Sequence, residues 1–137
     1  MENCFDPGIL KKLRVAQGQK ILVVNAPEGY LPLFSGLYPD TVFQSAEAGK
    51  YDFVQVFGAS RGELDNLMQK IKAAGKYDCM LWACYPKGGG KIKSDLKREI
   101  VWESLELINL RPVSQIALDD TWSALRGRPR EKVKNNS

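Results

Sequence analysis

The chain has 137 residues, of which 44% are hydrophobic and 26% are charged, and its formal net charge is +4. These values are typical of a globular protein with one domain and argue against disordered or fibrous chains. No apolar run approaches the ~20 residues of a transmembrane helix, and the N-terminus lacks the features of a signal peptide, so we expect a cytoplasmic protein without a membrane partner.

The chain contains no histidine and three cysteines. Without histidine, a single chain cannot form a Cys-His nucleophile, a Ser-His-Asp triad or most zinc sites, so we expect no metal. Cys79 and Cys84 share a predicted strand, where they are ~16 Å apart and on opposite faces, and therefore cannot form a disulfide. Cys79 is expected to be a buried apolar side chain. For Cys84, which is near the strand end, the alternative is a reactive thiol.

The positive charge is concentrated at the C-terminus. Residues 126–137 contain five basic residues and one acidic residue, whereas residues 1–125 are balanced, with 15 of each. We therefore predict a single α/β domain over residues 1–126 and a basic, flexible tail over residues 127–137. A solvated tail is favoured over a nucleic-acid-binding arm.

The first half of the chain alternates between helical and strand patterns. A helix is predicted between Asp6 and Gly18, and the β-branched run in Lys20–Asn25 predicts the first strand. Thr41–Gln44 and Tyr51–Phe57 predict a short and a longer strand. Because about six residues separate these two strands, either they run antiparallel or the first is not an ordinary sheet strand.

The strongest helix signal is the capping box formed by Ser60 and Glu63, which is followed by a regular apolar face and by Gly75 as the expected terminator. The apolar run Cys79–Tyr85 then predicts a strand buried on both faces, and Pro86 ends it.

The second half continues the alternation. Ser94 is placed to cap a helix over Asp95 to about Asn109. Pro112 opens the last predicted strand, Val113–Leu118, and suits an edge position. The pattern predicts an α/β fold with a Rossmann-like open, mostly parallel sheet of about five strands flanked by helices. Ligands bind at the carboxyl ends of such strands. The loops expected there are Asn25–Tyr30, Gly58–Arg61, Pro86–Ser94 and Asp119–Trp122.

The loop after Pro86 combines three glycines with three lysines. Flexible amides, lysine side chains and a helix start favour binding of a phosphate or carboxylate, although a mobile, solvated loop fits equally well. A P-loop is excluded, because Tyr85 and Ile92 occupy positions that require glycine and Ser/Thr. The candidate ligand-binding residues of this loop are Lys87, Gly88, Gly89, Gly90, Lys91, Lys93 and Ser94.

Asp119 and Asp120 follow the last predicted strand. Adjacent positions in a strand point to opposite faces, so the two carboxylates are not expected to act as one dyad. A salt bridge or a cap of the turn at Trp122 is favoured over acid–base or magnesium roles. The other polar candidates near the expected cleft are Ser123, Arg126, Glu28 and Tyr30.

Two motifs, Leu-Trp-x-x-Tyr-Pro-Lys at 81–87 and Asp-Asp-x-Trp-Ser-x-Leu-Arg at 119–126, resemble those of a bacterial family of unknown function. The resemblance covers Lys20–Arg126 and implies a cytoplasmic α/β domain without an established activity. More distantly, Tyr51–Lys87 is similar to the later half of Rossmann-type methyltransferases. The chain departs from those enzymes at Asn25–Tyr30, where Asn-Ala-Pro-Glu-Gly-Tyr replaces their glycine-rich nucleotide loop, and this argues against methyl transfer.

Three functional hypotheses follow. The favoured one is an α/β domain that binds a small anionic ligand at the carboxyl ends of the strands. The first alternative is a transferase-like enzyme in which Asp119 or Asp120 performs acid–base chemistry and Lys87 stabilises charge. The second is a nucleic-acid or protein-interaction module that uses the basic tail. The sequence identifies no cofactor, substrate or oligomeric state.

Overall fold

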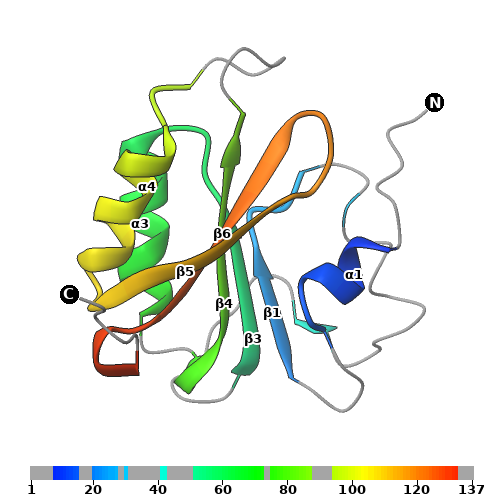
Figure 1. Ribbon diagram of the computed structural model, residues 1–137, viewed down its shortest axis with the longest axis vertical. Helices are drawn as coiled ribbons and strands as arrows, with labels where there is room; N and C mark the ends of the chain where they lie inside the picture. The colour runs from blue at the N-terminus through cyan, green and yellow to red at the C-terminus, as the bar shows by residue number, and fades with distance from the viewer. Residues whose placement is uncertain are drawn as a thin grey trace.

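The computed structural model of the protein describes residues 8–15, 20–27, 30, 41–42, 51–72, 75–87 and 94–132. The labels of the elements are those of Figure 1. In chain order they are α1 (Ile9–Lys12), β1 (Ile21–Val24), β2 (Thr41–Val42), β3 (Tyr51–Phe57), α3 (Arg61–Ile71), β4 (Gly75–Pro86), α4 (Arg98–Glu106), β5 (Leu110–Ala117), β6 (Trp122–Pro129) and the 3-10 helix η1 (Arg130–Lys132).

The described strands form one six-stranded sheet in the order β2-β1-β3-β4-β6-β5 (Figure 1). Strands β1 to β4 pair in parallel, whereas β6 runs antiparallel to both β4 and β5. The predicted α/β class and Rossmann-like arrangement are confirmed. The prediction of a mostly parallel sheet is wrong, because the segment after Thr121 adds an antiparallel strand inside the sheet and makes it mixed.

Strand β6 also corrects the predicted boundary at residue 126. It continues to Pro129, and η1 follows directly. Most of its residues are buried because it lies between two other strands. Part of the segment predicted as a flexible tail therefore belongs to the sheet, while residues 133–137 lie outside the described ranges.

Strand β1 lies between β2 and β3 and runs parallel to both. Neither alternative for Thr41–Gln44 is correct, because β2 belongs to the sheet and does not pair with β3. The observed β2 ends at Val42, so the connection to β3 comprises residues 43–50 and is longer than expected.

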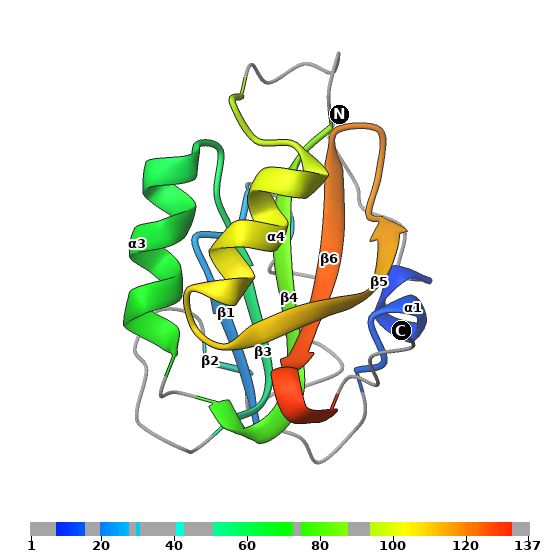
Figure 2. The same ribbon diagram turned by 60° about the vertical axis from the view of Figure 1, so that its left-hand side comes forward.

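An apolar core covers each face of the sheet, one toward α1 and one beneath α3 and α4 (Figure 2). Trp82 fixes α1 to the sheet, because its indole Nε1 donates a 3.0 Å hydrogen bond to the carbonyl oxygen of Leu13. Cys84 belongs to the first core and Cys79 packs against the second, which confirms that they lie on opposite faces.

Helix α3 begins as the capping box predicts. The hydroxyl of Ser60 accepts a 3.2 Å hydrogen bond from the backbone of Glu63, whose carboxylate accepts one of 2.7 Å from the backbone of Ala59. The glycine before this cap, Gly58, is required because a Cβ there would lie 2.8 Å from the Cβ of Leu64. Helix α3 can therefore pack closely against the end of β3.

Two helix boundaries differ from the predictions. Gly75 begins β4 instead of ending α3, whose C-cap is Lys72. Helix α4 begins at Arg98 with Lys97 as its N-cap, and Ser94 does not cap it. The hydroxyl of Ser94 instead accepts a 3.0 Å hydrogen bond from the backbone of Leu96.

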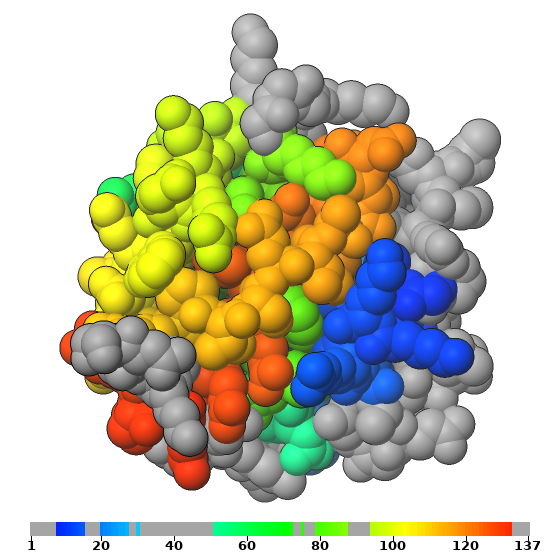
Figure 3. Space-filling view, viewed as in Figure 1, coloured from blue at the N-terminus to red at the C-terminus, as the bar shows by residue number. Residues whose placement is uncertain are grey.

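Strand β5 forms the edge of the sheet, as Pro112 predicts. Figure 3 shows β5 on the surface, with α4 on one side of it and α1 on the other. Strand β5 points in the same direction as β4, because both are antiparallel to β6, which lies between them. The carboxyl ends of β1, β3, β4 and β5 therefore lie at one end of the sheet.

Candidate functional site

The switch point of the sheet lies between β1 and β3. From β1 the chain passes to β2 on one side and then to β3 on the other, and α/β folds bind ligands beyond the strand ends at such a point. Asn25 follows β1 directly and has a φ of 62°, in the left-handed region that asparagine tolerates. Its Nδ2 donates a 2.7 Å hydrogen bond to the carbonyl oxygen of Phe57, the last residue of β3. The side chain of Asn25, which is an exposed residue, thus joins the two strand ends through a partly buried hydrogen bond.

Tyr30 is fully buried near this point. Its hydroxyl donates a 2.6 Å hydrogen bond to Oε1 of Gln55, and its ring packs edge-on against Phe57 with 4.9 Å between ring centroids. Burial and the neighbouring Cys84 raise the pKa of Tyr30, and the hydrogen bond with Gln55 acts in the opposite direction. Tyr30 therefore supports the switch point from inside the core and has no exposed surface with which to contact a ligand, contrary to its selection as a candidate.

Gln55 and Cys84 extend the buried polar contact across the sheet. Nε2 of Gln55 donates to the sulfur of Cys84 at 3.2 Å, so both ends of the amide have a partner. Burial raises the pKa of the Cys84 thiol well above its usual value. The alternative of a reactive Cys84 is wrong, because the thiol is fully buried and stays protonated at neutral pH.

Lys87 follows β4 and contacts the turn between β5 and β6. Its backbone N–H donates a 2.8 Å hydrogen bond to the carbonyl oxygen of Thr121. Asp119 organises this turn, because its Oδ1 accepts hydrogen bonds of 2.8 Å from the backbones of Thr121 and Trp122. This is the cap at Trp122 that the sequence predicts. Asp120 is exposed on the same turn.

Ser123 and Arg126 lie at different positions along β6. Ser123 pairs with Tyr85 near the carboxyl end of β4 and is buried. Arg126 pairs with Trp82, three residues further from that end. The strand therefore places Ser123 beneath the expected cleft and Arg126 away from it.

The N-terminus of α3 has acidic surroundings. Glu63 accepts the backbone N–H of Ala59, and Oδ1 of Asp95 accepts that of Arg61 at 2.9 Å. The carboxylate of Asp95 thus occupies the N–H of the first residue of α3, the hydroxyl of Ser60 occupies that of Glu63, and the carboxylate of Glu63 adds negative charge where a phosphate would bind. This end of α3 is not arranged to bind an anion.

Glu28, Gly88, Gly89, Gly90, Lys91 and Lys93 lie outside the described residues, so their binding roles stay predictions. Within the described ranges, no group of three or more histidine, cysteine and carboxylate side chains is arranged to hold a metal ion. No helix in that part of the chain has the length and apolar character needed to span a bilayer.

Sequence reasoning did not single out Asn25 or Gln55. A signal for Asn25 exists, since an asparagine directly after a β-branched run is suited to a left-handed turn at the strand exit. Gln55 lies within the apolar run Phe53–Phe57 of β3, and a polar side chain buried there requires a hydrogen-bonding partner. The partner itself, Tyr30, is 25 residues away and has no local signal.

No protein-family model matches the chain, and no curated protein is similar to it in sequence. Solved structures do share its fold. A SAM-dependent methyltransferase from Aquifex aeolicus has a TM-score of 0.67 at 15% identity, over 90% of this chain and 89% of that one. A putative type 11 methyltransferase from Sulfolobus solfataricus has a TM-score of 0.59 at 9% identity, and the match covers 98% of this chain and 96% of that one. Magnesium protoporphyrin IX methyltransferase from Synechocystis PCC 6803 with bound SAM has a TM-score of 0.61 at 10% identity, and the match covers 89% of this chain and 76% of that one.

At these identities the similarity shows the fold. The fold is that of structures described as SAM-dependent methyltransferases, and this overturns our favoured interpretation of a domain that only binds a small anion. The transferase-like alternative fits the comparison better. The absence of a glycine-rich loop after β1 does not prevent this fold, because the sheet and its switch point form with Asn25 at that position.

Proposed function

We propose that the protein is a transferase-like enzyme that binds S-adenosylmethionine at the carboxyl ends of β1 and β3 and transfers its methyl group. The observation that carries the proposal is the exposed side chain of Asn25, held at the switch point by its hydrogen bond to Phe57. The similarity in fold to SAM-dependent methyltransferases supports it.

The described residues fit a ligand with hydrogen-bond donors. Because Nδ2 of Asn25 is engaged, its Oδ1 is available as an acceptor, and it has no partner in the part of the chain that the structure describes. S-adenosylmethionine carries suitable donors in its ammonium group and its ribose hydroxyls. The neighbouring positions Ala26, Pro27 and Gly58 carry no charge, which suits the adenosine portion.

S-adenosylmethionine, when bound, supplies an electrophilic methyl group. The residues of the chain must then bind the acceptor and remove its proton. Asp120 is our candidate general base, because it is exposed on the turn that contacts the backbone of Lys87. Asp119 is a positioning residue, because its Oδ1 already holds two backbone donors. Lys87, whose backbone contacts the same turn, is our candidate for stabilising negative charge.

Isothermal titration of the full chain with S-adenosylmethionine and S-adenosylhomocysteine tests the binding step. The variant Asn25→Gly keeps the left-handed backbone and removes the side chain, so affinity should fall about tenfold through the loss of one hydrogen bond to the ligand. Asn109→Gly is the matched control, since Asn109 also has a left-handed φ of 64° but lies between α4 and β5. It should bind like the wild type.

Two outcomes would count against the proposal. If neither compound binds, the protein is not an enzyme of this class. If both bind and Asn25→Gly has the affinity of the wild type, the ligand does not contact Asn25 and the proposed site is wrong.

A further inference from the structure

Strand β5 leaves one edge of the sheet open. It pairs with β6 on one side, and its other side is the edge in the strand order of the sheet. Within β5, Val113, Ser114, Gln115 and Ala117 are exposed. An open edge presents backbone N–H and C=O groups with which another strand can pair.

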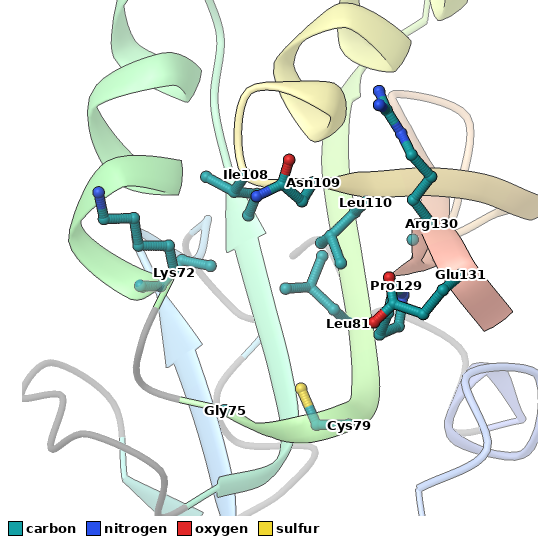
Figure 4. Close-up of a pocket in the computed structure, with 12 residues that line it drawn as sticks. Lys72, Gly75, Cys79, Leu81, Ile108, Asn109, Leu110, Pro129, Arg130 and Glu131 are labelled. Carbon is teal, nitrogen blue, oxygen red and sulfur yellow. The ribbon is translucent and has the colours of Figure 1, made fainter.

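The amino half of β5 is protected against such pairing. Figure 4 shows Leu110 pointing inward from the start of β5, toward a pocket of about 400 Å³. Pro112 has no backbone N–H, and the register with β6 shifts between Pro112 and Ser114, so Val113 is an inserted residue. Proline and bulges are among the features that keep natural edge strands unpaired. The carboxyl half, Ser114–Ala117, has neither of them and carries no charge.

Backbone groups in this carboxyl half point alternately toward β6 and away from it. The N–H of Leu118, directly after β5, donates a 2.9 Å hydrogen bond to the carbonyl oxygen of Trp122, the first residue of β6. Because the direction alternates along an antiparallel ladder, the backbone groups of Ile116 face β6, whereas those of Gln115 and Ala117 face outward. In the part of the chain that the structure describes, these outward groups have no hydrogen-bonding partner. Two donors and two acceptors are therefore in position to pair with a further strand.

The exposed large apolar side chains of the described residues border β5. They are Trp102 of α4, Leu107 in the turn before β5, and Val113. The indole Nε1 of Trp102 donates a 3.1 Å hydrogen bond to Glu106, and the same carboxylate oxygen lies 4.0 Å from Nε of Arg111 in β5. Trp102 is therefore on the flank of α4 toward β5, and Figure 3 shows α4 beside this strand. A chain packed against β5 would remove this apolar surface from water.

The two ends of β5 differ in charge. Among the described residues near its amino end, basic side chains outnumber acidic ones: Arg111, Arg128, Arg130 and Lys132 against Glu106 and Glu131. Glu106 lies 4.0 Å from both Arg111 and Arg130, and one carboxylate does not neutralise two guanidinium groups. Near the carboxyl end, Asp119 and Asp120 outnumber Lys87. In an antiparallel pair of β5 strands the basic end of each copy lies beside the acidic end of the other, whereas a parallel pair opposes like charges.

We infer that β5 pairs in antiparallel fashion with β5 of a second copy of this chain. Gln115 and Ala117 of each copy exchange backbone hydrogen bonds with the same two residues of the other, and the contact between the copies covers Val113 and Trp102. The pair has two-fold symmetry, so each copy closes the open edge of the other. This interface does not depend on the proposed methyl transfer.

Sedimentation equilibrium of the full chain tests the pairing. The mass should rise from 15.4 kDa toward twice that value as the protein concentration increases. Ala117→Pro removes an outward N–H and no hydrogen bond to β6, so the dissociation constant of the dimer should rise about tenfold or more. Ala117→Val is the matched control, because valine keeps the N–H and suits a strand, and this variant should dimerise like the wild type.

Amide hydrogen exchange of the wild type locates the interface without any variant. The N–H groups of Gln115 and Ala117 should exchange more slowly in a concentrated sample than in a dilute one. The N–H of Ile116, which faces β6, should exchange equally in both. The inference would be overturned by a chain that stays monomeric up to about 1 mM, a weak dissociation constant for a protein complex. It would also be overturned if Ala117→Pro folded and dimerised like the wild type, or if a dimer formed without protection of Gln115 and Ala117.

Discussion

The side-chain amide of Asn25 donates a 2.7 Å hydrogen bond to the carbonyl oxygen of Phe57, and this contact joins the carboxyl ends of β1 and β3. The two residues are 32 positions apart in the sequence, and they meet because β3 pairs directly with β1 after the chain has formed β2. The φ of 62° at Asn25 turns the chain sharply out of β1. One exposed residue therefore combines a structural contact with an acceptor atom, Oδ1, at the proposed ligand site.

Substitution separates the backbone role of Asn25 from its side-chain role. We expect Asn25→Ala to be less stable than Asn25→Gly by ~1 kcal/mol, because both lose the hydrogen bond and only alanine is strained in the left-handed region. Urea unfolding followed by tryptophan fluorescence measures the difference. Asn109→Ala and Asn109→Gly form the control pair and should differ by a similar amount. Equal stability of the two variants at position 25 would contradict the assigned backbone conformation.

Tyr30→Phe tests the buried hydrogen bond beneath the switch point. The variant removes only the hydroxyl and leaves Oε1 of Gln55 buried without that donor, so unfolding should become easier by ~1–3 kcal/mol. Adding Gln55→Leu to Tyr30→Phe removes the acceptor that has lost its donor. The double variant should therefore lose less stability than the two single variants lose together. Strictly additive losses in this cycle would show that the two side chains do not interact.

Stability should decrease at alkaline pH. Burial raises the pKa of Cys84 above its ordinary value of 9.0 and that of Tyr30 above 10.0, so the folded state keeps both groups neutral while the unfolded chain ionises. Their contribution to stability is complete below about pH 9 and falls above it, by up to ~1.4 kcal/mol per pH unit for each group. The stability difference between the wild type and Cys84→Ala should therefore narrow as the pH rises above about 9. A difference that does not change with pH would mean that Cys84 titrates normally.

Some signals within a few residues of each other predicted local structure correctly, whereas Gly75 and Ser94 did not mark the helix boundaries expected of them. The capping box at Ser60 and Glu63 starts α3, and Pro86 is the last residue of β4. Pairing between distant segments was not predictable. The run Trp122–Pro129 contains glycine, proline and two arginines, and it becomes a strand because β4 and β5 bury it from both sides. The role of Asn25 likewise depends on its hydrogen bond to Phe57 in β3, and the residues around Asn25 in the sequence do not predict this contact.

The C-terminal motif over residues 119–126 has a structural explanation. Asp119 caps the backbone N–H of Trp122, and Trp122 and Leu125 are buried in the cores on opposite faces of the sheet. A motif of this kind maintains a turn and a central strand, and it does not by itself identify an active site. The resemblance of the chain to a bacterial family remains a prediction.

Asp119 and Asp120 should respond differently to substitution. Asp119→Ala removes the acceptor of two backbone N–H groups, as the loss of a helix cap does, so we expect a destabilisation of ~1–2 kcal/mol in thermal unfolding. Asp120→Asn should leave stability unchanged, because Asp120 is exposed. Under the proposed function it should lower the rate of S-adenosylhomocysteine release with a methyl acceptor by about 100-fold or more. Full activity of this variant would remove Asp120 from the proposal.

The last prediction concerns the close approach of Gly58 to Leu64. A Cβ at position 58 would lie 2.8 Å from the Cβ of Leu64 and 3.0 Å from its Cα, and α3 cannot retreat without disturbing its cap at Ser60. Gly58→Ala should therefore be destabilised by ~1–3 kcal/mol, the usual cost of overpacking.

Gly62→Ala is the matched control, because Gly62 lies in α3 and a Cβ there would meet nothing within 4 Å. Alanine is the better helix former, so this variant should gain ~0.5–1 kcal/mol in urea unfolding. If both variants were stabilised, α3 would be free to move relative to β3. The end of β3 would then not hold a fixed position beside Asn25, and the proposed site would lose its rigid wall.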